Sequence, residues 1–357
     1  MKILFIESDN LKEYNCSNWR CAIPMRALRR AGHDAHMIRI EEWDKRTETA
    51  IKLTQAADII FVQRNLFNET LGEVFYWRAK GKVVVADVDD SYKDMTEETG
   101  SPSYAYWIKG KIKEGDKEYI LSPTPQEMLT FGAKLCGSLS SPSELICEDW
   151  KKIVRTYWFP NYLDLSLYKR NTNFRHDPGA IHIGWGGSMT HLVSWIASGA
   201  AEAVSQLINE NPRIKFVHVG DPRCERLFKI PAKNRLCGVW IPQPSFGAKL
   251  SSFDIGLIPL SGEYDRRRSW IKTAEYSVMG IPWIGTDMEP TRSVDTGLRV
   301  KNTAEDWYKA LKLYTENIEA FQDAAAANIE ASKERFDIDL HTDELVTLFE
   351  KIIKETK

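Results

Sequence analysis

The chain has 357 residues, of which 43% are hydrophobic and 27% are charged, and its formal net charge is −2 at pH 7. This composition excludes an intrinsically disordered chain and a coiled coil. The small net charge excludes a global electrostatic attraction to nucleic acid and leaves local basic patches open. A chain of this length exceeds one ordinary hydrophobic core, so two domains are expected.

Short apolar runs alternate with helical stretches twice along the chain. In the first half, strands are predicted at residues 3–6, 35–40, 59–62 and 83–88, with helices at 23–30 and 70–79. Residues 171–179 are polar, end in Pro-Gly and are predicted to link two domains. In the second half, strands are predicted at 181–185, 216–219, 238–241, 255–259 and 283–285, with helices at 192–207, around 324–327 and at 345–353.

This alternation predicts an α/β fold with two Rossmann-like domains whose parallel sheets face one central cleft. The expected domains are residues 1–168, which would bind the acceptor, and 169–339, with the helix at about 340–357 free to pack back on the first. No apolar run has the length of a membrane span, and the N-terminal run is too short for a signal peptide. The six cysteines form no C-x-x-C pair, so reduced thiols and a cytoplasmic location are expected. The seven histidines lack zinc-ligand spacing, so no metal site is expected.

A nucleotide-sugar site is the interpretation of residues 268–282. On a helix Arg268, Lys272 and Glu275 stand at i, i+4 and i+7 and share one face, while Ile271, Ala274 and Val278 lie on another. Two cations suit a diphosphate, and a carboxylate suits the paired hydroxyls of a ribose. The alternative is a solvated helix with a salt bridge between Lys272 and Glu275.

A second candidate is the glycine turn at residues 183–191, between a strand and a helix. Gly186 and Gly187 allow close approach of a phosphate to the backbone, and Ser188 or Thr190 can cap the helix that follows, near His191. The pattern is neither G-x-G-x-x-G nor a Walker loop, and a plain tight turn is the alternative.

Together these segments resemble the retaining GT-B glycosyltransferases of glycosyltransferase family 4, also called glycosyl transferases group 1. The likeness rests on motifs in order over nearly the whole chain. They are the Asp-x-Asp-Asp strand end at 86–90, the Pro-Asn turn at 160–164, the glycine turn at 184–191, Val-Gly at 217–221, the aspartate-led strand at 253–259 and Lys-x-x-Glu-Tyr before Gly-Ile-Pro at 272–282.

The resemblance implies roles for single residues. Lys272 and Arg268 would hold the diphosphate and stabilise the leaving group. Glu275 would bind the ribose, and the glycine turn would bring its amides to the phosphates. The remaining donor-binding positions implied are Ser269, Gly220 and Trp240. One departure is Arg267, which stands where the family's Glu-x7-Glu pair has its first carboxylate. Glu263 or Asp265 could replace that carboxylate, or the triplet Arg266 to Arg268 could bind a further phosphate.

The first domain offers candidates for the acceptor side. Asp87, Asp89 and Asp90 follow a predicted strand, and one aspartate is expected to orient or activate the acceptor hydroxyl, with Asp87 and Asp89 as the candidates. A divalent cation, or capping and turn roles, are the alternatives. Residues 104–113 interleave aromatics with lysines, which would suit nucleic acid or an anionic membrane, or else form a solvated surface. The acceptor candidates are Asn15, Ser17, Arg20, Arg64 and Trp107.

The predicted function is the transfer of a hexosyl or pentosyl group from a nucleoside-diphosphate sugar to an acceptor hydroxyl, with retention and without a metal or other cofactor. The acceptor is a saccharide or glycan, or a hydroxylated base in DNA. A catalytically silent nucleotide-binding module is the first alternative. A nucleotide-dependent oxidoreductase is the second, disfavoured because neither half begins with G-x-G-x-x-G. The sequence leaves peripheral membrane contact and the oligomeric state open.

Overall fold

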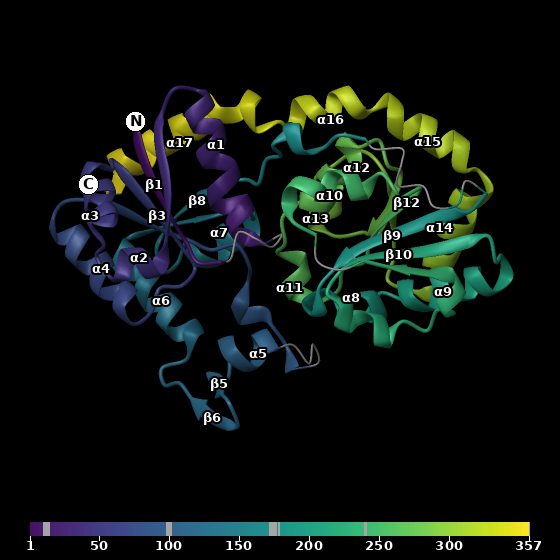
Figure 1. Cartoon of the computed structure of the whole chain (residues 1–357), viewed down its shortest axis with the longest axis horizontal. Helices are drawn as coiled ribbons and strands as arrows, with labels where there is room; N and C mark the ends of the chain where they lie inside the picture. The colour runs from purple at the N-terminus through teal and green to yellow at the C-terminus, as the bar shows by residue number, and fades with distance from the viewer. Residues whose placement is uncertain (10–14, 98–101, 171–176, 178, 239–240, 357) are drawn as a thin grey trace.

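The structure is a computed structural model that describes residues 1–9, 15–97, 102–170, 177, 179–238 and 241–356. It contains two six-stranded parallel sheets, each flanked by helices, which lie side by side (Figure 1). Most of the predicted linker at 171–179 and residues 239–240 of the predicted strand at 238–241 lie outside the described residues.

The first sheet has the strand order β2-β1-β3-β4-β7-β8. All five residues of its central strands β3 and β4 are buried, as expected for a parallel sheet with helices on both faces. The strands are β1 (Lys2–Glu7), β2 (Asp34–Arg39), β3 (Ile59–Gln63), β4 (Val83–Asp87), β7 (Ser138–Ser141) and β8 (Arg155–Trp158). The helices are η1 (Asn18–Ala22), α1 (Ile23–Arg30), α2 (Ile40–Asp44), α3 (Glu48–Ala56), α4 (Glu69–Ala79), η2 (Tyr92–Asp94), α5 (Pro102–Trp107), α6 (Pro125–Cys136), α7 (Glu144–Trp150) and η4 (Leu165–Leu167).

The second sheet has the strand order β11-β10-β9-β12-β13-β14, with every pairing parallel. Its strands are β9 (Ile181–Gly187), β10 (Ile214–Gly220), β11 (Arg235–Cys237), β12 (Ile255–Ile258), β13 (Trp283–Thr286) and β14 (Leu298–Val300). The helices are α8 (Met189–Ala197), α9 (Ala200–Glu210), η6 (Pro222–Leu227), η7 (Ala232–Asn234), α10 (Gln243–Leu250), α11 (Gly262–Arg266), α12 (Ile271–Val278), α13 (Glu289–Arg292) and α14 (Ala304–Glu316).

The C-terminal helices connect the two halves. They are α15 (Ile318–Ala327), α16 (Ile329–Phe336), η8 (Ile338–His341) and α17 (Thr342–Thr356), and they run along one side of the molecule from the second sheet to the first (Figure 1). In α17, the Phe349 ring lies 4.7 Å from that of Phe61 and 5.3 Å from that of Phe159. The last helix therefore belongs to the hydrophobic core beside the first sheet.

Some elements differ from those predicted. The helix expected at 192–207 is two helices, because the chain turns at Gly199, whose φ is +86° and whose added Cβ would stand 2.4 Å from the Ala304 nitrogen. One of the two outer strands of the second sheet is β11, which precedes the predicted 238–241. Strands β5 (Lys111–Glu114) and β6 (Lys117–Ile120) form an antiparallel hairpin that projects from the first domain (Figure 1).

Among the described helices, none has both the length and the apolar character needed to cross a bilayer.

Candidate functional site

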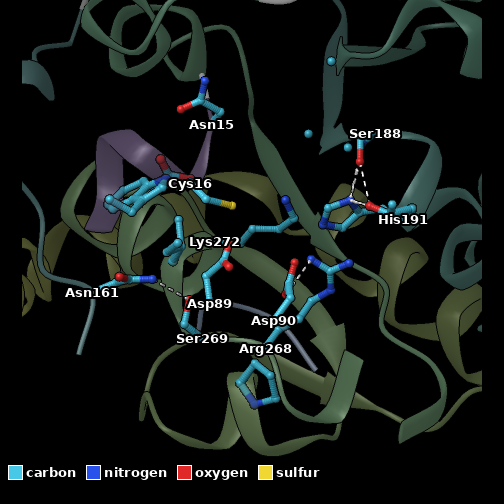
Figure 2. A pocket seen from close by; sticks show the side chains of 18 of the residues that line it. Asn15, Cys16, Asp89, Asp90, Asn161, Ser188, His191, Arg268, Ser269 and Lys272 are labelled. Carbon is cyan, nitrogen blue, oxygen red and sulfur yellow. Dashed lines mark hydrogen bonds and ion pairs between the residues drawn. The ribbon is translucent and has the colours of Figure 1, made fainter. Parts of the chain in front are cut away.

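A cavity of about 680 Å³ lies between the two halves, at the carboxyl ends of strands from both sheets. Open α/β sheets bind their ligands at this edge. Most of the predicted site residues line this cavity. They are Asn15, Arg20, Arg64, Asp89, Gly186, Gly187, Ser188, Thr190, His191, Gly220, Arg268, Ser269, Lys272 and Glu275. Figure 2 shows ten labelled lining residues, with Ser188 and His191 together on one side and Asn15 and Cys16 on the other.

The glycine turn forms one wall of the cavity. β9 ends at Gly187 and pairs with β10 so closely that a Cβ on Gly220, whose φ is +145°, would stand 2.0 Å from the Gly187 carbonyl oxygen. A Cβ on Gly187 would stand 2.4 Å from the Trp185 ring. By contrast, a Cβ on Gly186 would meet its nearest neighbour at 3.7 Å, so packing does not require glycine there. The turn delivers the N-terminus of α8 to the cavity, where backbone N–H groups and the helix dipole favour an anion.

His191 lies in the first turn of α8 and is a neutral hydrogen-bond donor. Burial, followed by the charges of Arg268 and Lys272, holds the pKa of His191 well below its usual range. The Ser188 backbone N–H donates to His191 Nδ1 at 3.4 Å, which places the ring proton on Nε2. A neutral imidazole can therefore donate to a phosphate or sugar oxygen.

The segment around Lys272 forms the opposite wall and differs from the predicted helix. α12 begins at Ile271, so Arg268 precedes the helix and the i, i+4, i+7 arrangement is wrong. Arg268, Lys272 and Glu275 nevertheless all line the cavity. No ion pair joins Lys272 to Glu275 among the described residues. Glu275 is instead buried and accepts a hydrogen bond from the Tyr168 hydroxyl at 2.8 Å.

The cations in the cavity wall differ in what they contact. Five lysine and arginine side chains line it in the described part of the chain, and four of them pair with a carboxylate: Arg20 with Asp87, Arg64 with Asp9 and Asp89, Arg223 with Asp221, and Arg268 with Asp265. Lys272 has no such partner within the described ranges. Burial lowers the pKa of Lys272 to about 8, against the attraction of Glu275. Arg268 keeps a buried Nη2 atom without a hydrogen-bond partner in the same ranges. Lys272 and Arg268 can therefore bind a ligand anion.

Asp87, proposed above as catalytic, is bound on both carboxylate oxygens. Arg20 Nη2 donates to Oδ1 at 2.7 Å and Nε donates to Oδ2 at 2.9 Å, while the Ser140 hydroxyl donates to Oδ1 at 2.6 Å. The Arg20 side chain is 0% exposed and that of Asp87 is 3% exposed. Asp87 does not line the cavity, so the geometry favours a structural role over the predicted catalytic one. Arg20 does line it, but its nitrogens bind Asp87, Asn161 and the Phe159 carbonyl, which leaves it poorly placed to bind an acceptor.

Asn161 links this buried ion pair to the donor side of the cavity. Its Oδ1 accepts from Arg20 Nη1 at 2.8 Å, its Nδ2 donates to the Ser269 hydroxyl at 3.0 Å, and its carbonyl accepts from Trp270 Nε1 at 2.7 Å. Asn161 thereby fixes the start of α12 against the first domain (Figure 2). The Pro-Asn turn contributed only to the family resemblance, and its site role was missed.

Asp90 is better placed than Asp89 to meet a substrate. Asp89 accepts from Arg64 Nη1 at 2.8 Å and from the Tyr92 hydroxyl at 2.7 Å, so both of its oxygens are engaged. Asp90 accepts from the Tyr264 hydroxyl on Oδ2 at 2.9 Å, whereas its Oδ1 lies 4.0 Å from Arg268 Nη1. Asp90 lines the main cavity and also a smaller one of about 320 Å³ beside it.

Comparison with known proteins gives matches in structure alone. No protein-family model matches the chain, and no curated protein sequence matches it. A sucrose-phosphate synthase from Thermosynechococcus elongatus aligns over 99% of this chain and 99% of its own, with a TM-score of 0.66 and 12% identity. The fold is GT-B. The predicted architecture is therefore confirmed.

Other solved structures that match the chain are described with more than one activity. A UDP-forming α,α-trehalose-phosphate synthase from Burkholderia xenovorans aligns over 87% of this chain and 78% of its own, with a TM-score of 0.57 and 10% identity. A Listeria monocytogenes protein described as a UDP-N-acetylglucosamine 2-epimerase aligns over 99% and 97%, with a TM-score of 0.56 and 12% identity. At these identities the likeness establishes the fold and leaves the reaction to the site.

The arginine triplet does not form a phosphate site in this GT-B chain. Arg267 pairs with Asp149 at 2.5 Å and with Asp94 at 3.2 Å, across the domain boundary, and Arg266 pairs with Glu289 at 2.8 Å. The two suggested substitutes for the missing carboxylate are also engaged: Glu263 pairs with Arg267 on the surface, and the buried Asp265 binds Arg268, Ser194 and the Ser261 amide.

The acceptor candidates are only partly brought together. Ser17 is buried against Gln63 and Asp9. The Trp107 ring stacks on that of Tyr92, with 3.9 Å between the ring centroids, and lines the smaller cavity but not the main one. The lysines of residues 104–113 continue into the β5–β6 hairpin, where three lysines and three acidic residues lie within 111–120 and Lys111 pairs with Glu118 at 3.1 Å, so this hairpin carries mixed charge. Trp240, the candidate for the nucleobase, lies outside the described residues.

Proposed function

We propose that this chain is a glycosyltransferase that moves a sugar from a nucleoside-diphosphate sugar to an acceptor hydroxyl. The observation that carries the proposal is Lys272, which has no carboxylate partner among the described residues and lines the same interdomain cavity as Arg268 and the N-terminal residues of α8. A bound diphosphate would accept hydrogen bonds from Lys272, from Arg268 and from the backbone N–H groups at the start of α8. As the glycosidic bond breaks, negative charge grows on the diphosphate, and cations fixed in a partly dry site stabilise that charge.

The other lining residues suit the remaining parts of such a donor. Glu275 would accept from the ribose hydroxyls, with Tyr168 holding its Oε1. His191 would donate from Nε2 to a phosphate or sugar oxygen. Because Lys272, Arg268 and the helix N-terminus supply the positive charge, we infer that the transfer needs no Mg²⁺. Retention is carried over from the resemblance to family 4, and the anomeric proton of the product tests it.

We propose a saccharide hydroxyl as the acceptor. The smaller cavity opens beside Asp90 and combines polar side chains with the rings of Tyr92, Tyr106, Trp107 and Tyr264, a mixture that suits a sugar ring. A hydroxylated DNA base, the other acceptor considered, finds little support in a hairpin of mixed charge.

The test is to incubate the protein with UDP-, GDP- and ADP-sugars, with EDTA or Mg²⁺, and with either oligosaccharides or hydroxymethylated DNA. Release of nucleoside diphosphate that requires the saccharide, indifferent to Mg²⁺, is expected. Release that requires DNA would overturn the acceptor assignment. A donor sugar that changes without release of the diphosphate would indicate an isomerase, which the epimerase-like fold makes the specific rival. Binding without either reaction would indicate a silent module.

Replacing Asp90 by asparagine is expected to lower kcat/KM for the acceptor about tenfold, the loss of one charge-assisted hydrogen bond. Donor affinity should stay within about twofold of the wild-type value, since asparagine still accepts from Tyr264. Steady-state kinetics with each substrate varied separately measures both. Asp89→Asn is the comparison variant, and a larger loss of acceptor kcat/KM there would contradict the choice of Asp90.

Donor binding is expected to take up protons above pH 8. Lys272 has a pKa of about 8 in the free protein, and a bound diphosphate raises that pKa. At pH 8.5, binding should therefore take up roughly 0.7 proton, and close to none at pH 6.5, so affinity falls as pH rises through 8. Calorimetry with a UDP-sugar in buffers of different ionisation enthalpy measures the uptake. Lys272→Arg should bind the UDP-sugar without taking up a proton. Proton uptake that persists in Lys272→Arg would refute the assignment of this uptake to Lys272.

A further inference from the structure

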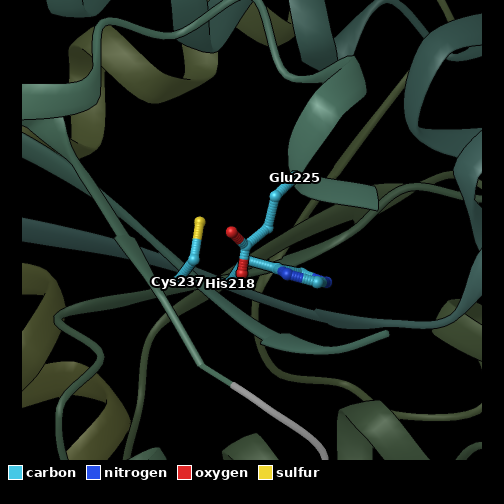
Figure 3. A group of neighbouring side chains, drawn as sticks. All are labelled: His218, Glu225 and Cys237. Atoms are coloured by element: carbon cyan, nitrogen blue, oxygen red, sulfur yellow. The ribbon is translucent and has the colours of Figure 1, made fainter. Parts of the chain in front are cut away.

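Three side chains that commonly bind transition metals meet beneath the glycine turn. His218 comes from β10, Glu225 from η6 and Cys237 from β11 (Figure 3). One ligand atom from each lies within 4.8 Å of the other two. None of the three lines the cavity of the proposed transferase site.

The histidine is oriented as metal-binding histidines are. Its Nε2 lies 3.2 Å from the Gly187 carbonyl oxygen, which accepts only, so Nε2 carries the proton and Nδ1 keeps a lone pair. His218 is 0% exposed, and its Nδ1 is buried without a hydrogen-bond partner among the residues described. A buried nitrogen lone pair left unsatisfied is uncommon in a folded protein, and a cation would satisfy it.

The kind of ligand set points to a borderline-soft ion. Imidazole, carboxylate and thiolate together are typical of Zn²⁺, whereas Mg²⁺ and Ca²⁺ prefer oxygen alone. Bonds of about 2.0–2.3 Å place tetrahedral ligands about 3.3–3.8 Å apart, so three ligand atoms within 4.8 Å of one another need at most small side-chain movements to bind one ion. Three protein ligands leave the fourth position to water.

We propose that His218 Nδ1, Glu225 and Cys237 form a site for one Zn²⁺ ion that braces the wall of the cavity. On binding, the Cys237 thiol releases its proton to solvent and its sulfur bonds to the metal, with no change of oxidation state. The ion connects β10 to β11 and holds His218 against the carbonyl of Gly187. The site supports the glycine turn from behind and takes no part in sugar transfer, so this proposal does not depend on the proposed function.

Cobalt tests the site, because a thiolate bound to tetrahedral Co²⁺ gives a charge-transfer band and intense visible bands. The full chain is stripped with EDTA, exchanged into chelator-free buffer and titrated with Co²⁺. One equivalent is expected to produce both features, and Zn²⁺ should abolish them. Cys237→Ser is expected to lose the charge-transfer band. Cys224→Ser should keep the charge-transfer band. Cys224 is buried and precedes Glu225 in the sequence, but its sulfur contacts the Met189 sulfur at 3.7 Å.

Three further measurements complete the test. Circular dichroism checks that Cys237→Ser is folded, and Glu225→Gln serves as a second variant, expected to weaken Co²⁺ binding at least tenfold. Zn²⁺ should raise the Tm of the wild type and of Cys224→Ser, and leave that of Cys237→Ser unchanged. A featureless wild-type spectrum, an unaltered band in Cys237→Ser, or its loss in Cys224→Ser would overturn the proposal.

Discussion

Replacing Lys272 by alanine is expected to weaken the binding of a nucleoside-diphosphate sugar by about 10- to 100-fold, the value of a charge-assisted hydrogen bond. At saturating donor, kcat should fall by about 100-fold or more, because the charge on the leaving diphosphate exceeds that in the ground state. Isothermal titration calorimetry gives the affinity, and the rate of diphosphate release gives kcat. The paired cations Arg64 and Arg223 cannot compensate, since aspartates already occupy them.

The same replacement should not destabilise the fold. Lys272 has no ion-pair partner among the described residues, and burial disfavours its charge. The Tm of Lys272→Ala is therefore expected to equal or exceed that of the wild type. Lys333→Ala is the matched control, because Lys333 pairs with Glu330 in α16 and its side chain is 42% exposed. Unchanged donor affinity in Lys272→Ala, with a normal Tm, would refute the diphosphate site.

Replacing Asp87 by alanine is expected to lower the free energy of unfolding by about 3–5 kcal/mol, because the Arg20 guanidinium is left buried without its carboxylate. Chemical denaturation monitored by circular dichroism measures the loss. Glu41→Ala provides the control, since its pair with Arg39 has about half of each side chain exposed and should contribute less than about 1 kcal/mol.

This prediction separates a structural from a catalytic aspartate. Asp87→Asn keeps the shape of the side chain and is expected to destabilise as well, because an amide nitrogen would face the Arg20 donors. If Asp87 were the acceptor base, Asp87→Asn would instead keep its stability and lose turnover. A variant with wild-type stability and no activity would therefore restore the catalytic role that the sequence indicated.

The sequence predicted the parts of the fold that depend on local patterns. Short apolar runs rich in β-branched residues, such as 59–62 and 83–88, form central strands, and their alternation with helices predicted two parallel sheets, which the structure confirms. Strand β7 was missed because it reads Ser-Leu-Ser-Ser, whose serines are buried by neighbouring layers and leave no hydrophobic run. The helix at 192–207 was predicted too long because the chain takes a positive φ at Gly199, where the close approach of Ala304 leaves no room for a side chain.

By itself, the sequence indicated two segments of the cavity wall, the glycine turn at 183–191 and the cations around Lys272, because both are local patterns, whereas the turn at 160–164 carried no such signal. Only the tertiary structure decided which of their charges a substrate can use. Asp87 and Asp90 are three residues apart on the chain, yet Asp87 meets Arg20 inside the fold and Asp90 faces the cavity. Likewise, the spacing in sequence of His218, Glu225 and Cys237 matches no metal-binding motif. The three side chains come together only when two strands and a short helix pack against one another. Whether a side chain is free to bind a substrate depends on contacts with residues distant in sequence, and those contacts form only when the chain folds.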